Sequence, residues 1–250
     1  MSAPIVVVGG GLTGIEAAAE FAEAGRRITL VTDILGPSLA SGGRRSVARR
    51  LTKLGVTVIA GAKVARLSAD SVTLTDGTEL PSAATVWTAG FGVPTLAAAS
   101  GLSTDGAGRL LTDETLTYVD DPSIVAAGDA ACPANAPVRM SCQFAMPLAS
   151  AAADTVLARI AGTQPGTVNP ASAGQCISLG RNAGTIQMAH LNDDALPLYI
   201  GGRLAAGIKE WVCNGTLKFL AKEARKPGSY FWPNGGKRRD PLPAAASGHR

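Results

Sequence analysis

The chain has 250 residues, of which 46% are hydrophobic, so it is long enough and apolar enough to fold around a substantial core. This composition excludes an intrinsically disordered chain, and since no apolar run approaches about 18 residues, it also excludes a membrane-spanning helix. The net charge of +4 gathers in two clusters that could serve phosphates, nucleic acid or anionic lipid, although a solvated helix face is the commoner explanation; they are Arg44, Arg45, Arg49, Arg50 and Lys237, Arg238, Arg239.

The first residues, MSAPIVVVGGG, lack the basic n-region of a signal peptide, so we expect a cytoplasmic protein. The β-branched run Ile5–Val8 is typical of a parallel strand that is buried on both faces. Gly9, Gly11 and Gly14 follow it in the spacing GxGxxG. In this motif the first glycine permits a tight turn, the second lets the backbone approach a pyrophosphate, and the third allows a helix to pack closely on the strand.

A helix, LTGIEAAAEFAEAG, and a second strand, RITLVTD, follow the glycine turn. Because this order of strand, turn, helix and strand is complete within about thirty residues, a dinucleotide site is favoured over a purely structural turn. An acid at the end of the second strand would bind the ribose of NADH, and the strand ends in Thr32 and Asp33. Arg44 or Arg45 could instead bind the 2′-phosphate of NADPH, so the choice between the two cofactors stays open.

The next segment is predicted to complete a small α/β domain. It contains a helix, a strand at Val56–Ala60 and two strand-like runs, the second of which ends in the hairpin turn Asp76–Gly77. ATVWTAGF then has the pattern of a buried strand that ends in a glycine turn. The ligand crevice of such a domain lies at the carboxyl ends of its strands.

The order of these motifs resembles the two-dinucleotide-binding flavoproteins, the pyridine-nucleotide oxidoreductases that include type II NADH dehydrogenases and apoptosis-inducing-factor-like reductases. GGGLTGIE, with Glu16, resembles the opening of the family's NAD(P)H domain, and Thr88–Gly90 resembles the turn that closes it beside the nicotinamide. IVAAGDAA resembles the strand that returns to the FAD domain, where Asp129 would hydrogen-bond the flavin ribityl chain. SCQFAMPLASAAADTVLARIAG resembles the helix beside the flavin ring, from which Gln143 would reach the flavin or a quinone.

The resemblance implies an α/β, Rossmann-like fold and a reaction in which FAD takes hydride from NAD(P)H and passes electrons to a quinone or another acceptor. It implies an NAD(P)H-binding domain over residues 1–95, the C-terminal part of an FAD-binding domain over 96–165, and a region with a hairpin, a helix and a basic tail over 166–250. Glu16 and Gln143 are the catalytic candidates. The candidate cofactor-binding residues are Gly9, Gly10, Gly11, Thr13, Gly14, Glu16, Thr32, Asp33, Ala89, Gly90, Gly128, Asp129, Gln143, Phe144 and Ala145.

Two of these residues have simpler structural alternatives. Glu16 either faces the ligand crevice or stabilises the first turn of its helix as an N-terminal acid. Asp129 either binds a ligand hydroxyl at the end of a strand or is a structural aspartate in a turn.

The chain departs from the family pattern in two respects. It opens at what resembles the second GxGxxG of the family, so we expect the first one, which binds the ADP half of FAD, to lie outside this chain, on a longer protein or a separate polypeptide. Otherwise the predicted strand SIVAAGD would have to repack on the NAD(P)H domain. In place of the quinone-associated AQxAxQ, residues 142–147 read CQFAMP, which weakens the case for a quinone.

The C-terminal region is predicted to hold a hairpin, formed by QCISLG and TIQMAH around RNAG, and a helix over residues 201–226. An apolar stripe on this helix either packs on its own domain or a homodimer partner, which is the simpler expectation, or lies on the inner face of a membrane as a peripheral contact. The stripe comprises Ile208, Trp211, Val212, Gly215 and Phe219, with Lys209, Lys218 and Lys222 elsewhere. The tail DPLPAAASGHR is expected to be disordered.

The chain contains few residues that could form a metal site or a nucleophilic triad. It contains two histidines and no CxxC, so we predict neither a metal site nor a Ser-His-Asp triad, and the four cysteines are expected to be reduced and mostly buried. No tyrosine is followed by a lysine four residues later, which excludes the Tyr-x-x-x-Lys pair of a short-chain dehydrogenase. No nucleic-acid partner is expected. The cysteines are Cys132, Cys142, Cys176 and Cys213.

Overall fold

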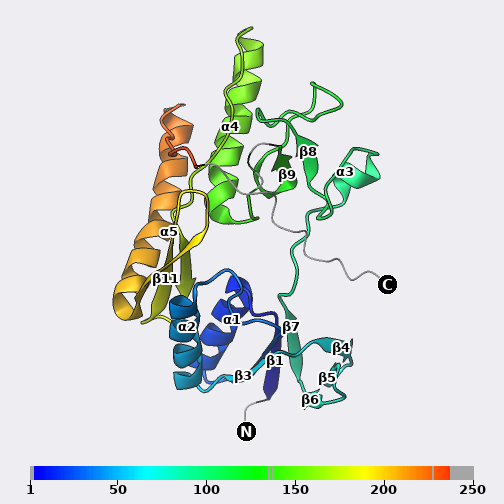
Figure 1. Ribbon diagram of the computed structural model, residues 1–250, viewed down its shortest axis with the longest axis vertical. Helices are drawn as coiled ribbons and strands as arrows, with labels where there is room; N and C mark the ends of the chain where they lie inside the picture. The colour runs from blue at the N-terminus through cyan, green and yellow to red at the C-terminus, as the bar shows by residue number, and fades with distance from the viewer. Residues whose placement is uncertain (1–2, 135, 137, 227, 237–250) are drawn as a thin grey trace. The chain divides into compact units, whose positions relative to one another are not determined.

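The computed structural model describes residues 3–134, 136, 138–226 and 228–236 (Figure 1). They form two compact units. Unit 1 takes the described residues within Met1–Gly90, Gly174–Ala189 and Ala195–Leu217, and unit 2 takes those within Phe91–Ala173, His190–Asp194 and Lys218–Arg250. The expected boundary at residue 95 lies close to the end of the first segment, whereas residues of the expected C-terminal region contribute to both units.

Unit 1 is built around a parallel four-stranded sheet with the strand order β3-β2-β1-β7. Its strands are β1 (Pro4–Val8), β2 (Arg27–Thr32), β3 (Thr57–Ala60) and β7 (Ala84–Trp87). The chain moves outward from β1 to β2 and β3, and then returns to the other side of β1 with β7. The boundary between β1 and β7 is therefore the topological switch point at which ligands bind in sheets of this kind. This architecture confirms the predicted α/β, Rossmann-like fold class.

Two helices, α1 (Leu12–Glu23) and α2 (Ser41–Lys53), lie side by side on one face of the sheet (Figure 1). Ile15 and Ala18 of α1 and Val47 and Leu51 of α2 are completely buried and form one core cluster with strand residues such as Leu30. These residues recur at helical spacing, so each helix turns one apolar face inward. The predicted helix after the glycine turn is confirmed.

The other face of the sheet carries a small antiparallel sheet of β4 (Val64–Leu67), β5 (Ser71–Leu74) and β6 (Glu79–Pro81). Val72 and Leu74 of β5 are buried against Val6, Val8 and Val31 of the parallel sheet. Residues 75–78, with the predicted Asp76–Gly77 turn, connect β5 to β6, so the predicted hairpin is confirmed.

A third sheet, β10 (Gln175–Ser178), β11 (Gly184–Ala189) and β12 (Ala195–Gly201), packs on the outer side of α1 and α2. Its β10–β11 hairpin is the one that the sequence predicts, whereas β12, which contains a proline and has no fully buried residue, was missed. Gln187 of β11 is completely buried and fixes this layer, because its amide donates to Leu198 O (3.1 Å) and accepts from Ala40 N (3.1 Å). The helix α5 (Gly202–Arg225) follows, as predicted.

Unit 2 contains α3 (Leu96–Ala99), a parallel pair of β8 (Leu110–Thr112) and β9 (Ala131–Pro133), the short helix η1 (Gly128–Ala130) and the long helix α4 (Cys142–Ile160). Phe144 and Leu148 of α4 are buried in its core together with Leu110 and Leu116.

The predicted strand in SIVAAGD is wrong. Tyr118 N donates to Ile124 O (2.9 Å) and Ala126 N donates to Leu116 O (3.0 Å), and these bonds make one isolated bridge between Thr117 and Val125. A strand needs a continuous ladder of backbone partners, and within the part of the chain that the structure describes this run does not have one. The run packs within unit 2 and leads into the turn at Gly128.

Candidate functional site

The glycine turn joins β1 to α1 at the carboxyl end of β1, and two of its glycines are required by packing. Gly9 has a φ of +116°, and a Cβ atom on it would lie 2.7 Å from Thr88 Oγ1. A Cβ on Gly14 would lie 1.9 Å from Gly9 O, so no side chain fits there. These are the roles expected for the first and third glycines of a GxGxxG turn.

Gly11 has a different environment. A Cβ atom on it would meet no described atom within 4 Å, whereas one on Gly10 would lie 2.4 Å from Thr32 Oγ1. Gly11 is also the N-cap residue of α1, and no side chain forms a capping hydrogen bond with the first turn of the helix. Thr13, in that first turn, is exposed. The helix N-terminus therefore opens onto free space beside Gly11, where its N–H groups and dipole favour a phosphate.

The turn after β7 closes the same crevice. Thr88 Oγ1 donates a hydrogen bond to Val8 O (2.8 Å), although the two residues are 80 positions apart in the sequence. Ala89 and Gly90 are exposed, and a Cβ on Gly90, whose φ is +89°, would meet no described atom within 4 Å. The structure thus brings the two predicted motifs together at the switch point between β1 and β7.

The residues at the end of β2 divide into one that faces inward and one that is accessible. Thr32 is buried, and its hydroxyl donates to Ile34 O (3.0 Å), so its side chain is engaged in the local turn; its assignment to the cofactor remains a prediction. Asp33 is 60% exposed and lies 3.7 Å from Lys63 Nζ. Of the NADPH candidates, Arg44 donates to Leu39 O (3.2 Å), while Arg45 is exposed.

Glu16 is not the N-terminal acid of α1 that one of the two alternatives expects. The first turn of α1 contains no acidic residue, and Glu16 lies one turn further on. Its Oε1 atom accepts a hydrogen bond from Ser178 N (2.8 Å) and forms an ion pair with Lys209 Nζ. The carboxylate thus ties α1 to β10 and α5, and its assignment as a catalytic residue remains a prediction.

A second group of predicted residues meets at the start of α4, in unit 2. Gly128 has a φ of +59°, and a Cβ on it would lie 3.7 Å from Ala145 Cβ. Asp129 is half-buried, and its Oδ1 accepts a hydrogen bond from Ser141 N (3.0 Å). Ser141 Oγ is buried and has no hydrogen-bond partner among the described residues. A buried polar atom of this kind calls for a partner, and it lies beside the carboxylate expected to hold a ligand hydroxyl.

Gln143 belongs to a polar network that the sequence does not reveal. Its amide donates weakly to Ser172 Oγ (3.5 Å), and Ser172 Oγ in turn donates to Asp193 Oδ1 (2.6 Å). Arg139 Nε donates to the other oxygen of the same carboxylate (2.5 Å). No local motif links all of these residues, since they come from three segments of the chain.

Phe144 is a core residue of unit 2. Its side chain is completely buried in the core of unit 2, and the guanidinium of Arg139 lies 5.5 Å from the centre of its ring. This burial gives the side chain a role in the core of unit 2, and the place of Phe144 among the cofactor-binding residues remains a prediction.

The cysteines are less buried than expected. Cys142 and Cys213 are exposed, and Cys132 and Cys176 are partly buried; none of the four forms a disulfide. Burial raises the pKa of the Cys132 thiol. Within the described residues no group of three or more potential metal ligands comes together.

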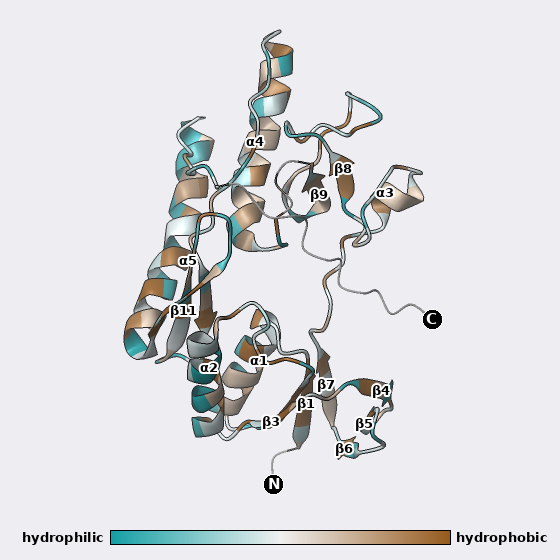
Figure 2. Cartoon of the chain, viewed as in Figure 1, coloured by the Kyte–Doolittle hydropathy of each residue, from teal (hydrophilic) through white to brown (hydrophobic). Residues whose placement is uncertain are grey.

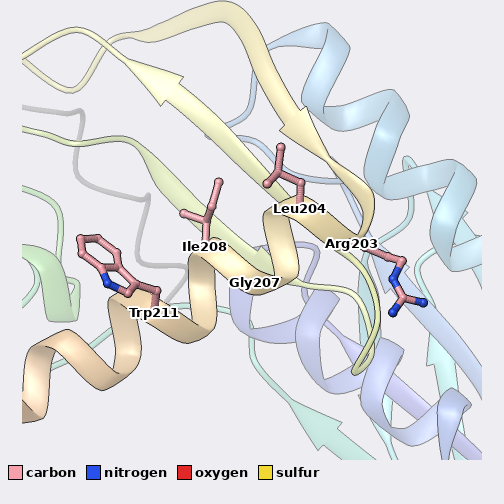
Figure 3. Close-up of a pocket in the computed structure, with 5 residues that line it drawn as sticks. All are labelled: Arg203, Leu204, Gly207, Ile208 and Trp211. Atoms are coloured by element: carbon pink, nitrogen blue, oxygen red, sulfur yellow. The ribbon is translucent and has the colours of Figure 1, made fainter.

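The apolar side chains of α5 are mostly exposed. Trp211 is 74% exposed and Phe219 54%, as is Leu204 near the start of the helix at 66%, so these side chains do not pack on their own domain in the described part of the chain. Packing on a homodimer partner remains a prediction. Figure 3 shows Leu204, Ile208 and Trp211 projecting from successive turns, around a shallow cavity of about 310 Å³. No helix among the described residues is both long and apolar enough to cross a bilayer.

Comparison with known proteins identifies relatives of this arrangement. The pyridine nucleotide-disulphide oxidoreductase family matches residues 1–155. Two relatives from Mycobacterium tuberculosis, the NADH dehydrogenase-like proteins MT1860 (strain CDC 1551 / Oshkosh) and Rv1812c (strain ATCC 25618 / H37Rv), are each 33% identical over 163 residues, which cover 59% of this chain and 41% of each relative. The chain therefore spans about two fifths of the length of these curated relatives.

Solved structures share the fold at lower sequence identity. NDH2 from Plasmodium falciparum, in complex with NADH, has a TM-score of 0.71 at 14% identity over 93% of this chain and 67% of that one. A ferredoxin reductase from Rhodopseudomonas palustris has a TM-score of 0.61 at 23% identity, over 75% and 48% of the two chains. At these identities the similarity concerns the fold alone.

Proposed function

This chain belongs to the pyridine nucleotide-disulphide oxidoreductase family, and on that premise we propose that it provides the NAD(P)H site of a flavin-dependent NADH dehydrogenase-like enzyme. FAD, when bound, would take hydride from NAD(P)H and deliver electrons to a quinone or another acceptor. The residues of this chain would bind, orient and enclose the two cofactors.

The observation that carries the proposal is the meeting of two glycine turns at the switch point of the sheet. The open space at Gly11 would admit the pyrophosphate of NAD(P)H to the N-terminus of α1, because no described side chain lies there. Gly90, which is exposed and close to the same crevice, would allow the nicotinamide to approach the backbone. Asp33 is the accessible acid for the adenosine ribose.

The residues at the start of α4 fit the ribityl part of FAD. Asp129 would accept hydrogen bonds from ligand hydroxyls with the oxygen that Ser141 N leaves free, and Ser141 Oγ would gain the partner it lacks among the described residues. Gln143, at the same end of the helix, is the candidate for orienting an electron acceptor.

One observation favours a second candidate function, in which the chain binds NAD(P)H but needs a further polypeptide segment to hold FAD. Among its described residues, unit 2 supplies only the two short strands β8 and β9 of a sheet, and the chain covers 41% of its curated relatives. A full dinucleotide-binding sheet would need additional strands beside them.

Purifying the chain, recording its visible spectrum and titrating it with NADH would test both candidates. A yellow protein that reduces menadione or ferricyanide with NADH would contradict the second candidate function, in which the chain cannot hold FAD by itself. A colourless protein that binds NADH would support that function. A chain that binds neither NADH nor NADPH would overturn both. Gly11→Asp should weaken NADH binding at least tenfold, because it adds a negative charge where the pyrophosphate enters.

The matched control for that variant is Gly166→Asp. Gly166 is exposed in unit 2, and a Cβ on it would meet no described atom within 4 Å, so the same change in charge should leave NADH affinity unaltered. Equal loss of affinity in both variants would count against the site at Gly11.

We further propose that α5 mediates peripheral contact with the cytoplasmic face of a membrane. The exposed stripe with Leu204, Trp211 and Phe219, next to Lys218 and Lys222, supports this placement. Co-sedimentation with anionic vesicles should be lost in Trp211→Glu. If instead Trp211→Glu converts a dimer to a monomer in analytical ultracentrifugation without any vesicle binding by the original chain, the stripe is a homodimer surface.

A further inference from the structure

The proposed function assigns no role to one basic region of unit 1. It is a groove of about 320 Å³ between the C-terminal half of α2, the β10–β11 turn and the start of α5. Arg49, Arg50, Lys53 and Arg203 contribute four positive charges to its lining, and none of its described lining residues is acidic. Asn182 adds a side-chain amide, and Ala183 and Gly184 line the groove with small residues.

The charge of this region follows from the sequence of α2. The helix carries five cationic residues and no acidic one; the cations are Arg44, Arg45, Arg49, Arg50 and Lys53. Figure 2 shows hydrophilic residues along this helix. Cations spaced along one helix repel one another, so such a helix is favoured when an anion lies nearby.

Two of the four guanidinium and ammonium groups are held in place by neighbours. Arg50 Nε donates to Leu179 O (3.0 Å), and its NH2 group lies 3.6 Å from Glu23. Arg49 NH2 donates to Tyr199 Oη (3.3 Å). A guanidinium that is already oriented loses less conformational entropy when it binds an anion. Glu23 compensates Arg50, so Arg49, Lys53 and Arg203 carry the excess charge.

The groove is distinct from the dinucleotide crevice. Lys53 ends α2 only four residues before β3 begins at Thr57, and Glu23 ends α1 four residues before β2 begins at Arg27, so the groove lies toward the amino edge of the parallel sheet. The glycine turn lies at the opposite, carboxyl edge. The thirteen residues of α2 separate the two edges by about 20 Å, at about 1.5 Å per residue.

We infer that this groove is a second anion site, which binds the phosphate group of a small phosphate ester. Planar guanidinium groups match phosphate oxygens in pairs, and a volume near 320 Å³ is at the lower end of small-molecule pockets, which suits a ligand of headgroup size. The phosphate could belong to a soluble ester or to the headgroup of an anionic phospholipid, since both present the same oxygens.

Heteronuclear NMR of the intact chain can test the site and its source. Two probes would be titrated in separate arms at low salt: glycerol 3-phosphate, and dihexanoyl phosphatidylglycerol below its critical micelle concentration. The backbone amides of Asn182, Ala183 and Gly184 should shift with saturation, whereas that of Gly11 should not. Preference for one probe of tenfold or more identifies the source of the phosphate.

Lys53→Glu reverses a charge in the groove, and Arg66→Glu makes the same reversal at an exposed arginine outside it. The apparent Kd for the preferred probe should rise at least tenfold in Lys53→Glu and stay within twofold in Arg66→Glu. If Lys53→Glu does not give a dispersed spectrum, Lys53→Gln, which should raise the Kd about threefold or more, takes its place.

Absence of shifts at residues 182–184 with both probes would overturn the inference. An equal rise of the apparent Kd in Lys53→Glu and Arg66→Glu would also overturn it, since the probe would then bind by unspecific attraction to a basic surface. Shifts confined to Gly11 and its neighbours would assign the phosphate to the dinucleotide crevice and also overturn it. The result does not depend on NADH binding or on flavin, so it can fail while the proposed function stands.

Discussion

Gly14 lies directly against Gly9: a Cβ atom on Gly14 would stand 1.9 Å from the carbonyl oxygen of Gly9 and 2.6 Å from Thr88 Oγ1. The first turn of α1 therefore touches both the end of β1 and the turn after β7. One glycine holds together the two motifs that form the candidate crevice. Gly11, three residues earlier, has no such neighbour among the described atoms.

Because of this difference, substitution by alanine should affect stability at Gly14 and NADH binding at Gly11. Gly14→Ala should lower the free energy of unfolding by about 3 kcal/mol, because the methyl group has no room and must displace backbone. Gly11→Ala should leave stability within about 0.5 kcal/mol but weaken NADH binding, because its methyl group enters the open space at the helix N-terminus. Urea denaturation followed by circular dichroism, together with NADH titration, checks both. Equal destabilisation by the two variants would contradict the packing at Gly14.

The burial of Phe144 predicts a structural effect in unit 2. Phe144→Ala should cost about 3–5 kcal/mol of stability, since it leaves a large cavity in the core. Gln143→Ala, its neighbour, should cost clearly less, about 1 kcal/mol, because it removes a long 3.5 Å hydrogen bond to Ser172 and leaves no large apolar cavity in the core. Urea denaturation followed by near-UV circular dichroism measures the difference. A stable Phe144→Ala protein would show that the side chain is not a core residue.

The partners of Glu16 predict a coupling with Lys209. Glu16→Gln keeps an oxygen for Ser178 N but loses the ion pair, and Lys209→Met loses the ion pair alone. A double-mutant cycle on unfolding free energies should give a coupling of about 1 kcal/mol, because both side chains are partly buried. If Glu16 also acts in catalysis, Glu16→Gln should reduce turnover of the complete enzyme while Lys209→Met does not. A coupling indistinguishable from zero would remove the structural role.

Cysteine labelling should separate the four thiols. Cys142 and Cys213 are exposed and should react with iodoacetamide at pH 8 within minutes. Burial raises the pKa of Cys132, so less thiolate is present and its labelling should be several-fold slower. Mass spectrometry of peptides taken at successive times resolves the sites. Labelling of Cys132 as fast as that of Cys213 would refute the burial on which this order depends.

Stability at high pH should depend on Tyr230. Burial raises the pKa of its hydroxyl to about 12, above the ordinary value of 10 in an unfolded chain. The stabilising contribution is therefore complete below pH 10 and is lost as the pH rises from 10 to 12, because the unfolded state releases its proton first. Tyr230→Phe removes this dependence, so the free energy of unfolding of the original chain should fall more steeply between pH 10 and 12 than that of the variant. Parallel curves for the two proteins would contradict the shift.

The local structure could be predicted from the sequence wherever neighbouring residues decide the backbone geometry. The glycine turn, α1, the Asp76–Gly77 hairpin and α5 were all predicted, because glycine spacing, turn residues and helical periodicity act over a few residues. The strand β12 was missed because its sequence ALPLYIG contains Pro197 and lacks the alternation of a half-buried strand. The run before Asp129 has the composition of a strand, but strand formation also requires neighbours.

The sequence by itself determined the glycine turn between β1 and α1, since only glycine tolerates the contacts at Gly9 and Gly14. The tertiary contacts of each side chain could not be predicted from the sequence. Glu16 finds its partners 162 and 193 residues away, in Ser178 and Lys209, and Phe144 turns into a core whose other members come from distant segments. Periodicity shows that a helix has an apolar face, but which surface covers it, and therefore which residues remain free for a ligand, depends on long-range packing.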